Sequence, residues 1–301
     1  MTQPTGTSPR FPAASASASA SNIGSGSLND IVVQMNAEAG PVKMSAFEGE
    51  RIAKVIARAG LCSRRDAERL IEEGRVQLNG KVLASPAVNV GPIDTVAVDG
   101  IPLPAPERAR LWRYHKPAGL VVSHKDPQCR PTVFEKLKTQ LPRVVSIGRL
   151  DLNTEGLLLL TNDGELERQL ELPANGWIRR YRVRVYGKPD PEALGRLKEG
   201  VTIEGVKYGE IDAVIDKFQG DNAWLTIAIR EGKNREVKRV CEHLGLRVNR
   251  LIRVAFGPFQ LGELPRGGLQ EVPPNVLRDQ LGGKIGAGHA HAHRRGKVQR
   301  P

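Results

Sequence analysis

The sequence contains no long apolar run and only three cysteines. No stretch approaches the roughly 18 consecutive apolar residues that a membrane-spanning helix needs, and no signal peptide opens the chain. We therefore predict a cytoplasmic protein that does not enter a membrane. Cys62, Cys129 and Cys241 are far apart and show no C-x-x-C spacing, so we expect free thiols instead of disulfides or a zinc site.

Motifs that bind nucleotides or metals are also missing from the sequence. It has no P-loop and no G-x-G-x-x-G segment. Residues 151–156 copy the first half of a calcium-binding loop, but the twelfth position of that loop, which requires a bidentate Glu, is Asn162. We therefore expect neither a metal site nor a bound cofactor.

Basic residues outnumber acidic residues. The 301 residues include 45 Lys or Arg and 33 Asp or Glu, which gives a formal net charge of +12 and a pI near 9.9. Such an excess favours a polyanionic partner, either nucleic acid or an anionic membrane. Because no membrane signal accompanies it, nucleic acid is the expected partner.

Composition divides the chain into tails and two domains. A domain is typically on the order of 100–150 residues, so this length suits two modest domains with extensions. Residues 1–48 are rich in Ala, Ser, Gly and Pro and predict a disordered tail, while residues 276–301 predict a basic disordered tail. The proline-containing stretch 104–109 predicts a linker between domains at 49–103 and 110–275.

The first domain combines two short helices with a hairpin. Apolar residues at helical spacing predict a helix over 51–59, and Ser63 followed by Asp66 is typical of the capping box that starts a second helix. The Asn-Gly pair at 79–80 then predicts a tight turn between two short strands.

Basic side chains crowd these two helices, and they allow two interpretations. They either form a solvated face balanced by neighbouring acids, or they contact a phosphate backbone with an affinity that weakens with salt. Residues 51–98, with A-G-x-x-S-R-R-x-A-E-x-L-I-x-x-G-R-V-x-x-N-G-K, closely resemble the RNA-binding module shared with ribosomal protein S-four. That resemblance favours RNA contact by Arg51, Arg58, Arg64, Arg65 and Arg69.

The second domain alternates strands with short helices. Apolar patterns predict strands at 111–114, 120–122, 180–186, 211–218, 224–229 and 248–254, with helices at 133–138, 165–170, 190–200 and 237–244. Hairpin-length gaps between them indicate an α+β fold built on a mixed, mostly antiparallel sheet. Within 180–186 the alternation is strict, so Tyr181, Val183 and Val185 share one face of a strand while arginines line the other.

A polar loop lies at the centre of this domain. Residues 148–156 separate the apolar runs 144–147 and 157–160, which are short enough to be buried strands. This frame presents the Asp151 carboxylate on a loop, with Arg149 two residues away. Such an acid can perform chemistry or simply cap a turn.

Motifs around this loop are similar to those of pseudouridine synthases of the RsuA and RluB type. The block G-R-L-D-x-x-T-E-G-L-L-L-L-T-N-D-G at 148–164 follows K-P-x-G at 116–119, and it precedes Y-R-V-R-V at 181–185 and E-G-K-N-R-E-V-K-R at 231–239. The motifs occur in the family's order, and the preceding RNA-binding module is also the family's. The resemblance implies a mixed, mostly antiparallel sheet with the site in a central cleft.

The resemblance also implies the reaction, which isomerises a uridine in structured RNA without a cofactor. The bond from ribose to nitrogen 1 of uracil is cut, the base rotates while held, and the sugar is rejoined to carbon 5. Asp151 falls on the carboxylate that acts at the sugar, either as nucleophile or by removing a proton. Tyr181 falls on the residue that stacks on the base and serves as general base, and Lys238 on the cation beside the carboxylate.

Each of these residues also has an ordinary structural interpretation. Without the motifs, Asp151 would be a turn former, Tyr181 a packing residue of the sheet and Lys238 a solvated lysine. Arg149 either pairs with Glu155 or contacts RNA beside the flipped nucleotide.

The substrate RNA is the finer question. The segment 261–269 resembles the large-subunit type of the family more than the small-subunit type, so we predict 23S rRNA, with 16S rRNA as the alternative. A non-catalytic RNA-binding factor for ribosome assembly is the alternative from another functional class. Nothing in the sequence indicates a coiled coil or a repeat, and we expect a monomer.

Overall fold

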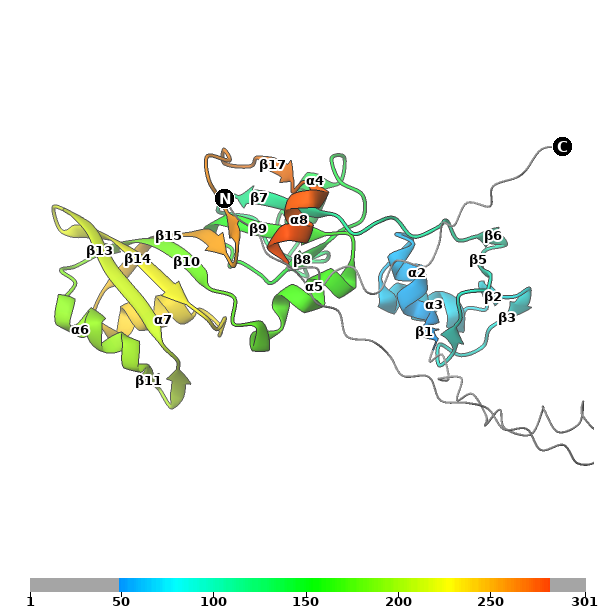
Figure 1. Ribbon diagram of the computed structural model, residues 1–301, viewed down its shortest axis with the longest axis horizontal. Helices are drawn as coiled ribbons and strands as arrows, with labels where there is room; N and C mark the ends of the chain where they lie inside the picture. Colours follow the sequence, from blue (N-terminus) through cyan, green and yellow to red (C-terminus); the bar gives the residue numbers. More distant parts are fainter. Residues whose placement is uncertain (1–48, 282–301) are drawn as a thin grey trace, which may run out of the picture. The chain divides into compact units, whose positions relative to one another are not determined.

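Figure 1 shows the computed structural model of the protein, which describes residues 49–281. Its N-terminal part contains the predicted helix pair, α2 (Ile52–Arg58) and α3 (Arg64–Glu72). The Ser63 hydroxyl accepts a hydrogen bond from the Asp66 backbone N–H at 3.1 Å, so α3 begins at the predicted cap.

Short strands complete this N-terminal part. The predicted hairpin consists of β2 (Val76–Leu78) and β3 (Lys81–Val82), and it belongs to an antiparallel sheet with the order β3-β2-β5-β6, in which β5 is Val96–Val98 and β6 is Ile101–Pro102. A separate pair joins β1 (Glu50–Arg51) to β4 (Asn89–Val90). The helices and strands share one small core, which includes Ile52, Ile56, Ala67, Ile71 and Val98.

A nine-stranded sheet forms the second part of the chain. Its strand order is β13-β14-β10-β15-β9-β7-β17, with β16 paired to β15 and β8 paired to β9. The strands are β7 (Leu111–Lys116), β8 (Val145–Ile147), β9 (Thr154–Thr161), β10 (Arg179–Tyr186), β13 (Ile211–Gln219), β14 (Asn222–Ile229), β15 (Arg247–Phe256), β16 (Phe259–Gln260) and β17 (Leu269–Glu271). All pairs are antiparallel except β9 with β15, so the predicted mixed, mostly antiparallel sheet is confirmed.

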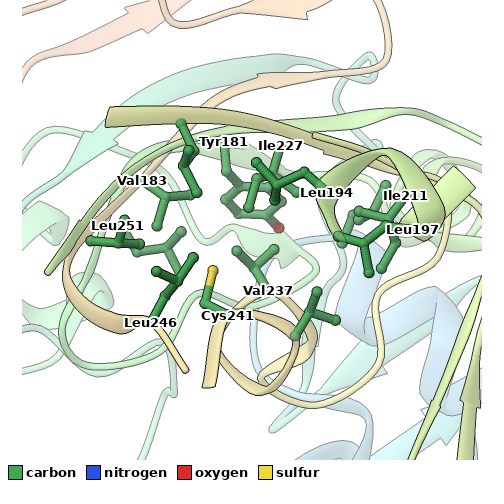
Figure 2. Packing of buried hydrophobic residues seen from close by; sticks show 14 of the residues in the cluster. Tyr181, Val183, Leu194, Leu197, Ile211, Ile227, Val237, Cys241, Leu246 and Leu251 are labelled. Atoms are coloured by element: carbon green, nitrogen blue, oxygen red, sulfur yellow. The ribbon is translucent and has the colours of Figure 1, made fainter. Parts of the chain in front are cut away.

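Helices pack on both faces of the nine-stranded sheet. One face carries α4 (Val133–Leu137), α6 (Pro191–Arg196) and α7 (Glu236–His243), and the other carries α5 (Gly164–Glu171) and α8 (Pro274–Gln280). Strict alternation along β10 turns Tyr181, Val183 and Val185 into the core beneath α7. Figure 2 shows Tyr181 and Val183 packed against Val237 and Cys241 of that helix. A small antiparallel pair, β11 (Val201–Ile203) with β12 (Val206–Tyr208), lies beside this core.

The parallel pair β9–β15 joins the two halves of the sheet through a glycine. Gly156 pairs with Arg253 and has φ +102°, and a Cβ built on it would lie 2.2 Å from the Arg253 carbonyl oxygen. Only glycine fits such a backbone approach. Because β9 begins at Thr154, the loop that connects β8 to β9 is 148–153. Gly156, the last residue of the predicted loop 148–156, lies inside β9.

One predicted strand and one predicted domain boundary are wrong. Residues 120–122 form no strand and contribute only an isolated bridge from Val121 to Thr132. The predicted tail boundary at 276 falls inside α8, because Leu277 and Leu281 are buried in the core on the α5 side. The remainder of both predicted tails, 1–48 and 282–301, lies outside the described residues. Between residues 49 and 281, no helix is long and apolar enough to cross a bilayer.

Candidate active site

Loop 148–153 connects β8 to β9 and carries Asp151, and a buried lysine forms hydrogen bonds with the backbone of this loop. Lys116, at the end of β7, is fully buried. Its Nζ donates hydrogen bonds to the carbonyl oxygens of Asp151 at 3.1 Å, Leu152 at 3.1 Å and Thr154 at 2.9 Å, and to that of Pro117 at 3.1 Å. Carbonyls of the loop therefore converge on one ammonium group, which orders the backbone that carries Asp151.

Burial lowers the pKa of Lys116 to about 8, while the nearby carboxylates of Asp151 and Glu155 act in the opposite direction. The ammonium thus adds positive charge beneath the loop at neutral pH. The sequence contained this lysine in the K-P-x-G motif, but sequence reasoning gave it no role.

The Asp151 carboxylate contacts Lys238 of helix α7. Lys238 comes from the first turn of α7, and its Nζ donates to Asp151 Oδ2 at 3.1 Å. The lysine side chain is 14% exposed and the Asp151 side chain is 40% exposed, so the aspartate is the more accessible member of the pair. The ammonium group thus forms a charge-assisted hydrogen bond with the carboxylate. The two residues are 87 positions apart in the sequence.

A cavity of about 150 Å³ brings Asp151 and Tyr181 together. Tyr181 is 9% exposed and belongs both to the cavity wall and to the core under α7. The exposed Arg149 lines the same cavity and a larger one of about 710 Å³ beside it. Asp151 also lines both cavities.

Glu155 does not pair with Arg149, which removes one of the two interpretations of that arginine. The buried Glu155 carboxylate accepts from Arg250 Nε at 2.8 Å and Nη2 at 3.0 Å, and Arg266 Nη2 lies 3.2 Å from it. The bonds to Arg250 are the first cause of a lowered Glu155 pKa.

Three further cavity residues were not identified from the sequence. Glu236 is buried, and burial raises its pKa to about 7. Arg253 is buried as well; its Nε donates to the Leu157 carbonyl at 2.8 Å, whereas its Nη2 has no hydrogen-bond partner among the described residues. Arg179 donates to the carbonyls of Trp177 and Arg230 and stacks over Phe256. Periodicity gave no signal for Glu236 and Arg253, since a buried charge interrupts an apolar pattern, or for Arg179, which is half-buried.

Glutamates of α5 border the larger cavity. Glu171 accepts a hydrogen bond from the backbone N–H of Gly148, at the start of the loop that carries Asp151. Burial and the neighbouring Glu171 raise the pKa of Glu167 to about 7.

The predicted RNA-binding arginines of the helix pair are mainly on its surface. Arg51, Arg64, Arg65 and Arg69 are exposed, whereas Arg58 is half-buried. Arg58 bonds the Glu50 carboxylate at 2.7 Å, and Arg69 lies 3.4 Å from Asp66. A basic module thus accompanies a sheet domain with an ion-paired carboxylate in an open cavity, an arrangement suited to an enzyme that acts on nucleic acid.

Comparison with known proteins narrows this class. The family described as RNA pseudouridylate synthase matches residues 110–243, and the S4 domain family matches residues 50–96. An uncharacterized RNA pseudouridine synthase of Rickettsia felis is 48% identical over 76% of this chain and 99% of its own. Ribosomal large subunit pseudouridine synthase B of Yersinia pestis is 41% identical over 77% of this chain and 76% of its own.

A solved structure agrees with these matches. The crystal structure of a pseudouridylate synthase superposes with a TM-score of 0.54 and 26% identity, covering 77% of this chain and all of the other. The chain belongs to the RNA pseudouridine synthase family and carries an N-terminal S4 domain. It is an isomerase that acts on RNA.

Proposed function

We propose that this enzyme converts one uridine of 23S rRNA to pseudouridine, with Asp151 as the catalytic carboxylate. The observation that carries the proposal is the 3.1 Å contact between Asp151 and Lys238 at a cavity that also includes Tyr181. A carboxylate that accepts a hydrogen bond from a neighbouring ammonium group can act at the sugar, either by attacking carbon 1′ or by removing a proton.

The remaining groups fit the later steps of the isomerisation. After the bond from carbon 1′ to nitrogen 1 breaks, the base must stay bound while it rotates, and Tyr181 in the cavity wall offers a ring for stacking. Once carbon 1′ has joined carbon 5, the proton on carbon 5 leaves, and the Tyr181 phenol is our candidate base. Arg149 is exposed and lines the larger cavity, which supports a role in contacting the phosphate of the flipped nucleotide.

The choice of 23S rRNA rests on relatives and on one segment. Proteins described as ribosomal large subunit pseudouridine synthase B are 40–41% identical to this chain. Residues 261–269, which resemble the large-subunit type, run from the end of β16 to the first residue of β17, and Gly267 N–H donates to the His115 carbonyl of β7 at 2.8 Å. We further propose that arginines of the S4 domain hold the RNA, that no cofactor takes part, and that the enzyme works as a cytoplasmic monomer.

Mapping of pseudouridine in both rRNAs of a deletion strain tests the proposal. We expect one 23S position to lose its pseudouridine, and complementation with Asp151→Asn to leave it unmodified. Asp190→Asn is the matched control, because Asp190 caps α6 and asparagine caps a helix equally well. The control variant should restore modification.

Other outcomes identify the alternatives. Loss of a 16S position instead would identify a small-subunit enzyme, and loss of no position would refute the ribosomal assignment. Restoration of modification by Asp151→Asn would refute the catalytic role of this carboxylate. If that variant restores growth without restoring pseudouridine, the cellular role is that of a non-catalytic assembly factor.

A further inference from the structure

Strands β10 and β15 present a set of arginines on the face of the sheet opposite the Tyr181 side. Tyr181, Val183 and Val185 are buried under α7, so the alternate residues of β10 point the other way. We call the resulting surface the arginine face and define it by Arg182, Arg184 and Tyr186 of β10, Trp224 of β14, and Arg247 and Arg250 of β15.

The strand register places these six residues beside one another. Arg184 lies between Trp224 on one neighbouring strand and Arg250 on the other, and Tyr186 is opposite Arg247. The surface is accessible: the Arg182 side chain is 48% exposed, that of Arg250 is 41% exposed, and Arg247 is exposed.

Positive charge on this surface exceeds the negative charge that contacts it. Arg182 lies 3.6 Å from Asp216, and Arg250 pairs with Glu155. Arg184 and Arg247 have no ion-pair partner within residues 49–281. Like charges directly opposite each other on neighbouring strands are destabilising, as for Arg184 and Arg250. An external anion would relieve this repulsion.

Aromatic rings hold two of the guanidinium groups in place. The Arg182 guanidinium lies 4.8 Å from the Trp224 ring centroid, and that of Arg247 lies 5.0 Å from the Tyr186 centroid. A guanidinium stacked on a ring keeps its N–H edges free, and those edges match the bidentate geometry of a phosphate. The stacking also reduces the side-chain entropy lost on binding.

We propose that the arginine face binds the phosphate backbone of a second segment of the RNA substrate, separate from the segment at Asp151. The two surfaces are on opposite faces of one sheet, so a folded RNA must reach around or across the strand ends to contact both. The choice of RNA as the ligand rests on the proposed function, whereas the existence of an anion-binding surface does not. RNA is favoured over an acidic protein because the enzyme already acts on RNA and because stacked guanidinium groups suit phosphates.

The test is equilibrium binding of the full chain to a short RNA duplex without uridine, measured over a series of KCl concentrations. The double variant Arg182→Gln, Arg247→Gln removes both stacked cations. Its matched control is Arg196→Gln, Arg278→Gln, which removes two exposed arginines of α6 and α8. Each phosphate contact on a duplex makes the negative slope of log K, the binding constant, against the logarithm of the salt concentration steeper by about 0.9.

We expect the arginine-face variant to lose about 1.8 from that slope and more than about tenfold in affinity at 0.1 M KCl, whereas the control variant stays close to wild type. Asp216→Asn should tighten binding, since it removes the acid beside Arg182 while an amide oxygen can still accept from Thr226. This second variant adds affinity instead of removing it, so it tests the proposal even if the double variant folds poorly.

Three results would overturn the proposal. Unchanged slopes for the arginine-face variant would exclude RNA contact, and equal losses in both double variants would indicate a general charge effect. Unchanged RNA binding combined with lost binding to polyglutamate would assign the surface to an acidic protein. Because pseudouridine formation is not the readout, these results do not depend on whether Asp151 is catalytic.

Discussion

Gly156→Ala should separate the two halves of the sheet and damage the candidate site without touching any of its side chains. Gly156 pairs with Arg253 where β9 runs parallel to β15, and the two strands share three residue pairs. The loop that carries Asp151 leads into β9. Tyr181 lies on β10, which pairs with β15, and Lys238 lies on α7, which packs on the same half of the sheet. A side chain at this joint therefore acts on the 3.1 Å contact between Asp151 and Lys238.

The cost has two parts. A Cβ at residue 156 would lie 2.2 Å from the carbonyl oxygen and 2.7 Å from the nitrogen of Arg253, distances that real Cβ atoms do not show, so the strands must move apart. Forced overpacking costs about 1–3 kcal/mol, and alanine at φ +102° adds roughly 1–2 kcal/mol. We expect a loss of about 2–5 kcal/mol in the free energy of unfolding.

Thermal and urea unfolding of the full chain measure this loss, and single-turnover kinetics measure the effect on the site. For a domain of this size, each kcal/mol lowers Tm by about 2–4 °C, so a drop of roughly 4–20 °C is expected. Gly220→Ala is the control, because Gly220 also has positive φ (+58°) but has no atom within 4 Å of a Cβ. Equal Tm values for the two variants would refute the close-contact argument.

Three further changes test other parts of the fold and site. Glu236→Gln should raise the free energy of unfolding at pH 8 by about 2 kcal/mol and much less at pH 5. The pKa of this carboxyl is raised to about 7 in the folded protein, so its ionisation destabilises the fold increasingly as the pH rises above the pKa that the group has in the unfolded chain. A pH-independent gain in urea unfolding would contradict this. Lys238→Gln should lower kcat about 100-fold while RNA affinity in filter binding changes little, since it removes the cation beside Asp151; unchanged turnover would exclude that role. Thr132→Ala should cost about 1 kcal/mol by removing the capping box of α4, with Thr132→Ser restoring most of it in the same thermal assay.

Much of the fold was predictable from local signals. Most apolar runs, the Asn-Gly turn at 79–80 and the cap at Ser63 act over a few residues and are found where the sequence indicates. The alternation of β10 also predicted which side chains enter the core and that arginines occupy the other face. The 120–122 segment was assigned wrongly because a short apolar run can fill a core without joining a sheet ladder.

The sequence by itself therefore determined most of the elements, the sheet type and, through its motifs, the family. Periodicity could not determine which charges meet, because Lys116 and Arg250 come from strands distant in sequence from loop 148–153. For Lys238, only the family resemblance indicated a position beside Asp151. Only the tertiary structure assigned Lys116 to the loop carbonyls and Glu155 to Arg250, since charge pairing depends on distances of a few ångströms that local periodicity does not encode. The close approach at Gly156 is likewise a property of two strands in contact, and no neighbour in the sequence requires it.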